Sequence, residues 1–193
     1  MSIFRSAIAD WSDVPTGSMK PTIIEGDRIL INKMAYDIRI PFTHVSILKR
    51  DDPQRGDIII FDSDISNKRL VKRVIGIPGD YITMRNNRVY LNGNALKYTS
   101  SHTQPGHKVE YLSEMRYTIQ TQTSQSPYAS FNPVTVPEGY YLVLGDNRDN
   151  SADSRAIGFI PRHEIVGKTQ SLVWSLDYSN YLLPRRDRFL QKL

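Results

Sequence analysis

Short apolar runs bounded by turn residues recur along the chain, and most are rich in β-branched or aromatic side chains. Such runs are typical of buried strands. We therefore expect strands at 29–33, 58–61, 70–77, 81–84, 88–91 and 139–145. Asn86-Asn87 and Asn92-Gly93 are turn pairs that favour hairpins. Residues 34–54 are predicted to be irregular because Pro41 and Pro53 interrupt them, and few segments predict a helix.

Residues 97–133 differ in composition, with many Ser, Thr, Gln, Tyr and His residues and few aliphatic ones. This pattern predicts a more exposed β insertion with long loops. The tail 184–193 holds four basic residues and one acidic residue, so we expect it to be solvated, with attraction to anionic lipid as the alternative. No internal repeat is visible.

Composition narrows the possible functions without choosing one. The chain has 193 residues, 39% hydrophobic and 23% charged, which suits one globular domain or one domain with an insertion. Its net charge of +5 would suit nucleic acid, an anionic membrane surface or solubility alone. The absence of cysteine excludes disulfides, thiolate catalysis and cysteine-bound zinc. No apolar run approaches the roughly 18 residues of a membrane span, and the start, MSIFRSAIADW, is too short and charged for a signal peptide.

The stretch PTGSMKPT at 15–22 places one serine in a kinked loop. Gly17 allows close backbone approach, while Pro15 and Pro21 stiffen the flanks. Such a loop could hold out the Ser18 hydroxyl as a nucleophile, although a serine beside a glycine in a loop is more often structural.

A serine nucleophile needs a base to accept its proton. The chain has four histidines, and none lies in a context that resembles a catalytic triad: His44, His102, His107 and His163. Lys72 is the better candidate, because strand alternation places it on the face opposite Val71 and Arg73. Burial would lower its pKa towards neutrality, and a neutral amine can act as a general base. The alternative is a lysine that extends from an edge strand into water, with Arg73 pairing a nearby acid.

The segment GDNRDNSADSR at 145–155 concentrates three acids, two arginines, two asparagines and two serines after an apolar strand. A calcium loop is one interpretation, but the segment lacks the glycine and the terminal glutamate of the 12-residue calcium loop. A polar network in which acids and arginines neutralise each other is the second interpretation. A solvated loop is the third.

Four blocks, in this order, resemble the bacterial type I signal peptidases (leader peptidases), which trim exported preproteins with a serine–lysine dyad. The blocks are PTGSMKPT with EGD at 15–22 and 25–27, RGDIIIF at 55–61, KRVIGIPGD at 72–80 and GDNRDNSADSR at 145–155. Any one block could arise by chance, whereas all four in family order are specific.

The resemblance implies a role for each matching residue. Ser18 matches the nucleophile and Lys72 the general base, while Ser151 matches the serine that hydrogen-bonds and orients the lysine. Thr16 stands where many members have a serine whose hydroxyl helps to form the oxyanion hole; threonine keeps the hydroxyl, but its methyl group narrows the rotamer choice. Four further residues match a supporting charge network: Arg73, Asp146, Asp153 and Arg155.

The resemblance also implies a substrate. Members cleave after small residues at the first and third positions before the cut, the Ala-x-Ala pattern. Bulky apolar walls would leave shallow pockets that reject large side chains. The residues expected to line these pockets are Val14, Pro15, Met19, Ile29, Ile60 and Val71. Ordinary core is the alternative for Ile29, Ile60 and Val71. No metal, other cofactor or nucleic acid is implied.

By resemblance the fold is mainly β, with an antiparallel β-sheet catalytic core formed by 12–80 and 137–183. Residues 81–136 would be an inserted β subdomain, 1–11 the remnant of a juxtamembrane segment, and 184–193 a basic tail. Members usually carry a membrane anchor before the serine, and this chain is expected to lack a transmembrane helix of its own. The resemblance places the catalytic domain at the bacterial plasma membrane, on the periplasmic or extracytoplasmic side, with preprotein signal peptides and the membrane surface as partners.

Other readings of the same residues exist. The nearest is a maturation peptidase of a conjugation or secretion system with the same dyad. A self-cleaving repressor would need a DNA-binding module and its own scissile dipeptide, and neither is visible. A non-enzymatic basic β-domain could bind nucleic acid, but the aromatic residues are not interleaved with a basic strip. An inactive homologue would have no need to retain Ser18, Lys72 and Ser151.

Overall fold

The computed structural model describes residues 9–40, 46–101, 104–122 and 126–193. Strands dominate this part of the chain and pair antiparallel, so the predicted mainly β, antiparallel fold is confirmed. The helical segments are short: η1 (Gly17–Met19), α2 (Ser154–Ile157), η2 (Arg162–Glu164) and η3 (Arg186–Arg188). Among these described residues, no helix combines the length and the hydropathy needed to cross a membrane.

The largest sheet combines strands from the two ends of the chain. Its order is β1-β2-β16-β5-β6-β14-β15, and β17 pairs with β16 beside this path. Its strands are β1 (Ala9–Asp13), β2 (Asp27–Asn32), β5 (Ile58–Ser63), β6 (Lys68–Gly76), β14 (Tyr140–Leu144), β15 (Ile160–Pro161), β16 (Ile165–Asp177) and β17 (Leu183–Pro184).

The β5–β6 hairpin lies in the interior of this sheet. Residues 58–61 are all buried, which explains their continuous apolar run. β6 pairs with β5 in a register that sets Lys72 opposite Ile59. The other edge of β6 pairs with β14, where Arg73 lies opposite Leu144. Lys72 therefore lies on an interior strand, and the alternative of a lysine extending from an edge strand is wrong.

Residues 81–135 form two smaller sheets. One has the order β13-β7-β8-β9 and the other β10-β11-β12. Their strands are β7 (Tyr81–Arg85), β8 (Arg88–Leu91), β9 (Asn94–Ala95), β10 (Lys97–Ser100), β11 (His107–Leu112), β12 (Met115–Gln120) and β13 (Phe131–Thr135). The expected Asn86-Asn87 turn is present, with positive φ at both residues, as a two-residue hairpin turn favours.

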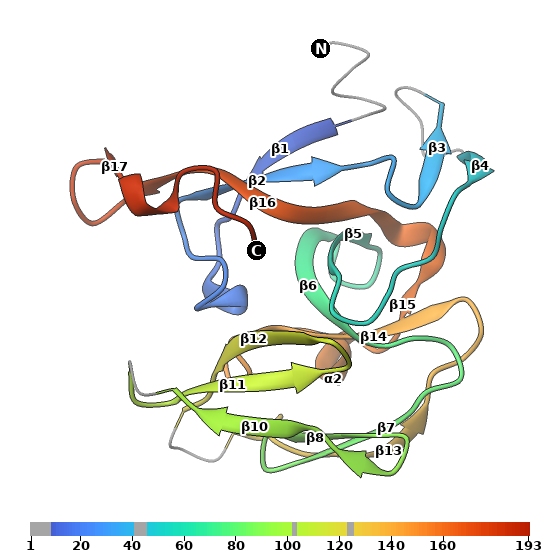
Figure 1. Cartoon of the computed structure of the whole chain (residues 1–193). Coiled ribbons are helices and arrows are strands. Elements are labelled where there is room, and N and C mark those ends of the chain that lie inside the picture. Colours follow the sequence, from blue (N-terminus) through green and yellow to red (C-terminus); the bar gives the residue numbers. More distant parts are fainter. Residues whose placement is uncertain (1–8, 41–45, 102–103, 123–125) are drawn as a thin grey trace.

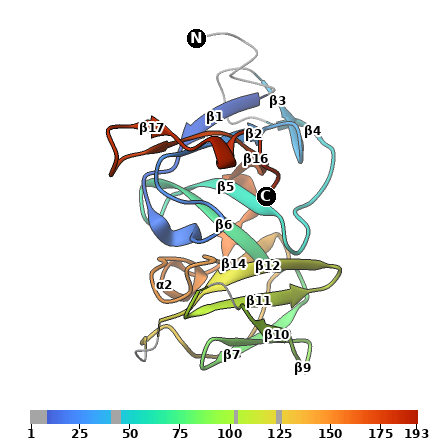
Figure 2. The same cartoon turned by 60° about the vertical axis from the view of Figure 1, so that its left-hand side comes forward.

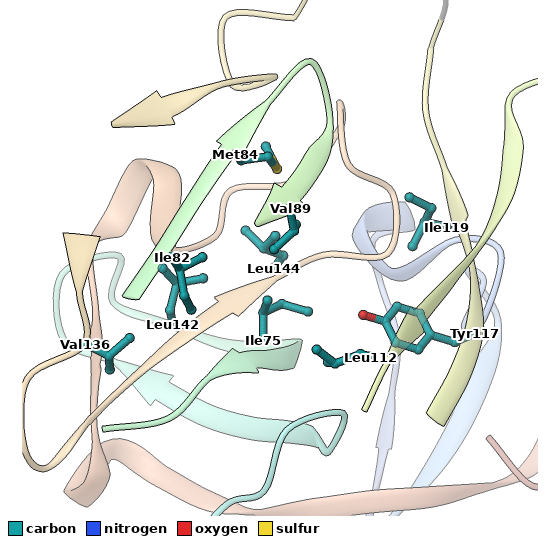
Figure 3. Close-up of a cluster of buried hydrophobic side chains, with 10 residues drawn as sticks. All are labelled: Ile75, Ile82, Met84, Val89, Leu112, Tyr117, Ile119, Val136, Leu142 and Leu144. Carbon is teal, nitrogen blue, oxygen red and sulfur yellow. The ribbon is translucent and has the colours of Figure 1, made fainter. Parts of the chain in front are cut away.

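The large sheet and the two smaller sheets form layers, as both views show (Figures 1 and 2). Between them lies a buried apolar cluster, to which β6 and β14 contribute from one side and β7, β8, β11 and β12 from the other (Figure 3). A second cluster lies beneath η1 and includes Met19, Ile29 and Ile60. The first cluster fixes residues 81–135 to the sheet that carries Lys72.

Three expectations need correction. Residues 34–54 are not wholly irregular, because β3 (Asp37–Arg39) and β4 (Ser46–Lys49) pair as a hairpin; Pro41 lies outside the described residues. This hairpin is held by Arg162, which pairs with the buried carboxylate of Asp37 at 2.8 Å. Because an ion pair holds this hairpin, its sequence has no periodic pattern of apolar residues from which the hairpin could be predicted.

The insertion is less exposed than its composition suggests. Leu112, Tyr117 and Ile119 are buried in the cluster between the layers, and the acidic side chain of Glu110 is completely buried. Sparse aliphatic residues at alternate positions are enough to cover one face of a sheet.

The basic tail is docked rather than solvated. Arg188 pairs with the buried Asp27 at 2.6 Å, and Arg185 donates to the Ser175 hydroxyl. The backbone N–H of Leu193 donates to the Gln170 carbonyl at 3.0 Å. Two of the arginines that suggested a solvated end are therefore anchors.

Candidate active site

Ser18 lies in η1, a single short turn in a loop fastened to the core. Met19 is 1% exposed and anchors the turn in the cluster beneath it. The Ile23 N–H donates to the Met19 carbonyl and closes the next turn. Because Met19 points into the core, the neighbouring Ser18 is left half-buried, with its hydroxyl on the side of β6.

Lys72 reaches this hydroxyl from β6. Its Nζ lies 2.7 Å from Ser18 Oγ and donates to the Val71 carbonyl at 2.9 Å. The lysine is 2% exposed. Burial lowers its pKa from the ordinary 10.5 to about 8, against the opposing effect of the carboxylates of Asp153 and Asp146. Nucleophile and base are thus in hydrogen-bond contact, and a sizeable fraction of the amine is neutral near pH 8.

Two arginines neutralise the carboxylates near Lys72. Arg73 binds both oxygens of Asp146, at 2.9 and 2.7 Å. Arg155 binds both oxygens of Asp153, at 2.8 and 2.7 Å. Bidentate pairs of this kind satisfy the carboxylates and fix their orientation. The negative charge that would hold a proton on Lys72 is therefore largely compensated.

The 145–155 segment also holds the nucleophile from behind. The Asn147 backbone N–H donates to the Ser18 carbonyl at 3.0 Å, and its side-chain amide donates to the Gly17 carbonyl at 3.0 Å. At Gly145, a Cβ atom would lie 2.5 Å from the Ser18 carbonyl oxygen and 2.2 Å from Ser151 Oγ. The close approach of these loops thus requires glycine at 145.

Comparison with known proteins identifies the family. The family model described as "Signal peptidase, peptidase S26" matches residues 1–174. This chain belongs to the signal peptidase family. A "Signal peptidase I" of Pseudomonas aeruginosa is 35% identical to this family member over 89% of the present chain and 66% of its own length. A "Signal peptidase IB" of Staphylococcus aureus is 34% identical over 85% of the chain and 77% of its own length.

This member of the signal peptidase family thus spans a little under two thirds of the Pseudomonas relative. A solved structure of a signal peptidase I from Enterococcus faecalis is 33% identical and covers 61% of this chain and 97% of its own. The TM-score between the two structures is 0.41.

Ser151 and Thr16 show how far this member matches the roles that the signal peptidase resemblance implies. The Ser151 hydroxyl is buried and has no hydrogen-bond partner among the described residues, and it makes no bond to Lys72 in this conformation. Thr16 precedes η1 with an extended backbone, an exposed side chain and no capping bond. Both hydroxyls are free to bind, and their roles stay predictions.

The residues expected to line the specificity pockets mostly belong to the core of this family member. Pro15 is exposed beside the nucleophile, and Val71 is partly buried against the cluster beneath η1. The other four are buried members of that cluster: Val14, Met19, Ile29 and Ile60. Val71 packs against them, and their contribution to a pocket stays a prediction.

Neither of the two histidines that the structure describes, His107 and His163, forms a hydrogen bond with Ser18. His44 and His102 lie outside the described residues. His163 is exposed beside Asp64 and Glu164. Among the residues with described positions, Lys72 is the one side chain that hydrogen-bonds Ser18 Oγ.

The 145–155 segment is a polar network in this structure. Besides Asp146 and Asp153, the carboxylate of Asp149 accepts bonds from the Asn87 amide and the Gln122 N–H. Each of the three carboxylates thus has donors from the protein. The donors compete with any cation, so the network interpretation fits better than the calcium loop.

One part of the site, the buried pair of Arg148 and Glu110, was not predicted from the sequence. Arg148, completely buried, binds both oxygens of Glu110 from β11, at 2.7 and 2.6 Å. Tyr98 and Tyr117 also donate to this carboxylate, and the Arg73 guanidinium lies over the Tyr117 ring at 3.9 Å. The insertion therefore supports the loop that supports Ser18. The only local signal was an acid at an inward position of HKVEYL, two residues from Leu112.

Proposed function

We propose that this chain is a serine endopeptidase that removes N-terminal signal peptides from exported preproteins, with Ser18 as nucleophile and Lys72 as general base. The observation that carries the proposal is the 2.7 Å contact between Lys72 Nζ and Ser18 Oγ, made by a lysine only 2% exposed. Membership of the signal peptidase family supports the same reaction. A maturation peptidase with this dyad would differ in its substrate and not in this chemistry.

In the first step, the neutral amine of Lys72 accepts the Ser18 proton as Oγ attacks the scissile carbonyl. With a pKa of about 8, about a tenth of the amine is neutral at pH 7. The negative charge on the carbonyl oxygen would be held by the Ser18 N–H and the Thr16 hydroxyl. Lys72, now an ammonium, donates its proton to the leaving amine nitrogen, and an acyl-enzyme remains.

In the second step, a water molecule attacks the acyl-enzyme. Lys72 accepts the proton of this water and becomes an ammonium. The ammonium then donates a proton to Ser18 Oγ as the ester bond breaks. Ser151 would orient the lysine in both steps. Its buried hydroxyl has no partner, which costs about 1–3 kcal/mol, and a bond to the amine would remove that cost.

We propose that cleavage follows an Ala-x-Ala pattern, with Pro15 and Val71 at the surface of the shallow pockets. The proposed location is the extracytoplasmic side of the bacterial plasma membrane, at the lipid surface.

The test is cleavage of a preprotein peptide with an Ala-x-Ala site, in detergent, across pH. We expect the cleavage rate to rise with pH around pH 8, where Lys72 loses its proton. Ser18→Ala and Lys72→Met should be inactive, and His163→Ala should match the wild type. A folded wild type that leaves this peptide intact, or a Lys72→Met variant that cuts it, would refute the proposal.

A further inference from the structure

An open cleft of about 630 Å³ lies directly beyond the nucleophile loop. Three segments far apart in the sequence line it: residues 20–24 after η1, the β11–β12 hairpin, and the tail at 188–193. Figures 1 and 2 both place the C-terminal end on the side of the large sheet that faces β12. The docked tail thus forms one wall of the cleft.

The lining of this cleft is basic and contains no acidic side chain. Its basic and imidazole residues are Lys20, Arg73, His107, Arg116, Arg188 and Lys192. Three of them pair with carboxylates outside the lining: Lys20 with Glu25, Arg73 with Asp146 and Arg188 with Asp27.

Arg116 and Lys192 supply charge without a partner. Both side chains are exposed, and within the described part of the chain neither forms an ion pair. They come from two different segments of the lining, since Arg116 lies on β12 and Lys192 in the tail. A ligand that enters the cleft therefore meets two positive charges that no ion pair of the described residues compensates.

The positions assigned to the pockets and the residues of the cleft flank the dyad along the chain. The surface positions assigned to the specificity pockets come before the dyad in the chain: Pro15 before Ser18, and Val71 before Lys72. The cleft residues come after it: Lys20 to Thr22 after Ser18, and Arg73 after Lys72. A polypeptide with its signal-peptide end at the pockets would therefore run into the cleft with the part that is released.

We propose that this cleft binds the first residues of the released mature protein and favours acidic side chains there. The inference rests on the proposed function for the direction of the substrate. Carboxylates at the second to fifth positions after the cut would lie between Arg116 and Lys192, where charge complementarity favours them. Because both cations are exposed, the expected preference is modest, about 3- to 10-fold in kcat/KM at low ionic strength.

The test compares two peptides with the same signal segment and Ala-x-Ala site. One carries Asp and Glu at the second to fifth positions after the cut, and the other carries the isosteric Asn and Gln. We expect the wild type to prefer the acidic peptide, with the difference shrinking at high salt. The double variant Arg116→Glu with Lys192→Glu should prefer the amide peptide. Arg85→Gln, which removes an exposed charge from β7, should keep the wild-type preference.

A second readout separates this inference from the proposed function. Peptides that begin at the first residue after the cut are labelled, and their binding is measured by fluorescence anisotropy. If no peptide is cut but the acidic product binds more tightly and the double variant removes that difference, the cleft inference stands and the proposed function fails. If both substrates are cut at equal rates at low salt, or the double variant keeps the preference, the cleft inference is wrong and the proposed function stands.

Discussion

At the scale of single residues, the site depends on the buried amine of Lys72. It also depends on the two nearby carboxylates, of Asp146 and Asp153, whose charges are neutralised by arginines. Burial lowers the pKa of Lys72, and the charges of Asp153 and Asp146 work against this effect. The arginines bound to these carboxylates are therefore part of the control of the base, although neither bonds to Lys72. This division of labour can be measured one arginine at a time.

Arg155→Gln should raise the pKa of Lys72. The substitution leaves the carboxylate of Asp153 uncompensated, and a nearby negative charge favours the protonated amine. Because Lys72 acts when neutral, the rising limb of the rate should move to higher pH, with activity recovering above pH 9. The measurement is the pH dependence of kcat/KM.

Arg55→Gln is the matched control for this prediction. Arg55 pairs with Asp80 at 2.5 Å, and Asp80 is not among the groups that shift Lys72. This variant should lose some stability, while the rising limb of its pH–rate profile should stay at the wild-type pH. A limb that moves equally in both variants would mean that the arginines act through general stability.

Thr16→Val tests the oxyanion hole. Valine keeps the branched shape of threonine but removes the hydroxyl, so only the Ser18 N–H would remain as a donor. Loss of one such donor typically lowers kcat by about 10²–10³-fold. Thr16→Ser should retain most of the activity, and KM should change little in either variant. Activity of Thr16→Val near the wild-type level would remove Thr16 from the mechanism.

At the scale of elements, the important contact is between β11 of the insertion and the segment 145–155. Glu110 and Arg148 form a completely buried ion pair, and two tyrosines donate to the same carboxylate. Burial would by itself raise the pKa of Glu110, but Arg148 and the hydrogen bonds outweigh it and lower that pKa. The insertion thus clamps the loop that holds the Ser18 carbonyl.

Glu110→Gln should destabilise the protein by about 3–5 kcal/mol, because it leaves the Arg148 guanidinium buried without a counter-ion. Urea unfolding measures the change. We also expect kcat to fall more than KM rises, since the loop behind Ser18 loses its support. Glu114→Gln, an exposed change in the same hairpin, should do neither, and equal stability of the two variants would contradict this role of Glu110.

The sequence predicts some elements far better than others. The strands at 58–61 and 70–77 were predictable from apolar runs, continuous at 58–61 and interrupted only by Lys72 and Arg73 at 70–77. The motifs identified Ser18 and Lys72 through a family resemblance. The β3–β4 hairpin and the docked tail were missed because ion pairs of Arg162 and Arg188 hold them. Such pairs join residues more than 100 positions apart and leave no period in the local sequence. Glu110 was also missed, because its partner Arg148 lies 38 positions away and the pair leaves no period in the local sequence.

At the scale of the whole molecule, the active lysine carries a cost in stability. An unfolded chain would hold its proton on Lys72 up to the ordinary pKa of 10.5, whereas the folded chain releases it at about 8. Below pH 8 both states are protonated, and the folded state bears the full penalty of a buried charge. The penalty decreases as the pH rises from about 8 to 10.5, so stability should rise with pH over that range.

Lys72→Met should therefore be inactive and more stable than the wild type. The pKa difference corresponds to a gain on the order of 3 kcal/mol at pH 7. The gain should fade towards pH 10.5, where the wild-type lysine is neutral in both states. Urea unfolding at pH 7 and at pH 10 measures both values. Equal stability of the two proteins at pH 7 would show that Lys72 is not desolvated.

Gly145 has a consequence for how sequences of this kind can diverge. Glycines 79, 93 and 139 have positive φ but open space around them, so asparagine is an acceptable substitute there. Gly145 faces the opposite restriction: its space is occupied by the Ser18 carbonyl and the Ser151 hydroxyl. In a library of random variants selected for activity, positions 79, 93 and 139 should therefore drift, while position 145 should remain glycine in every survivor.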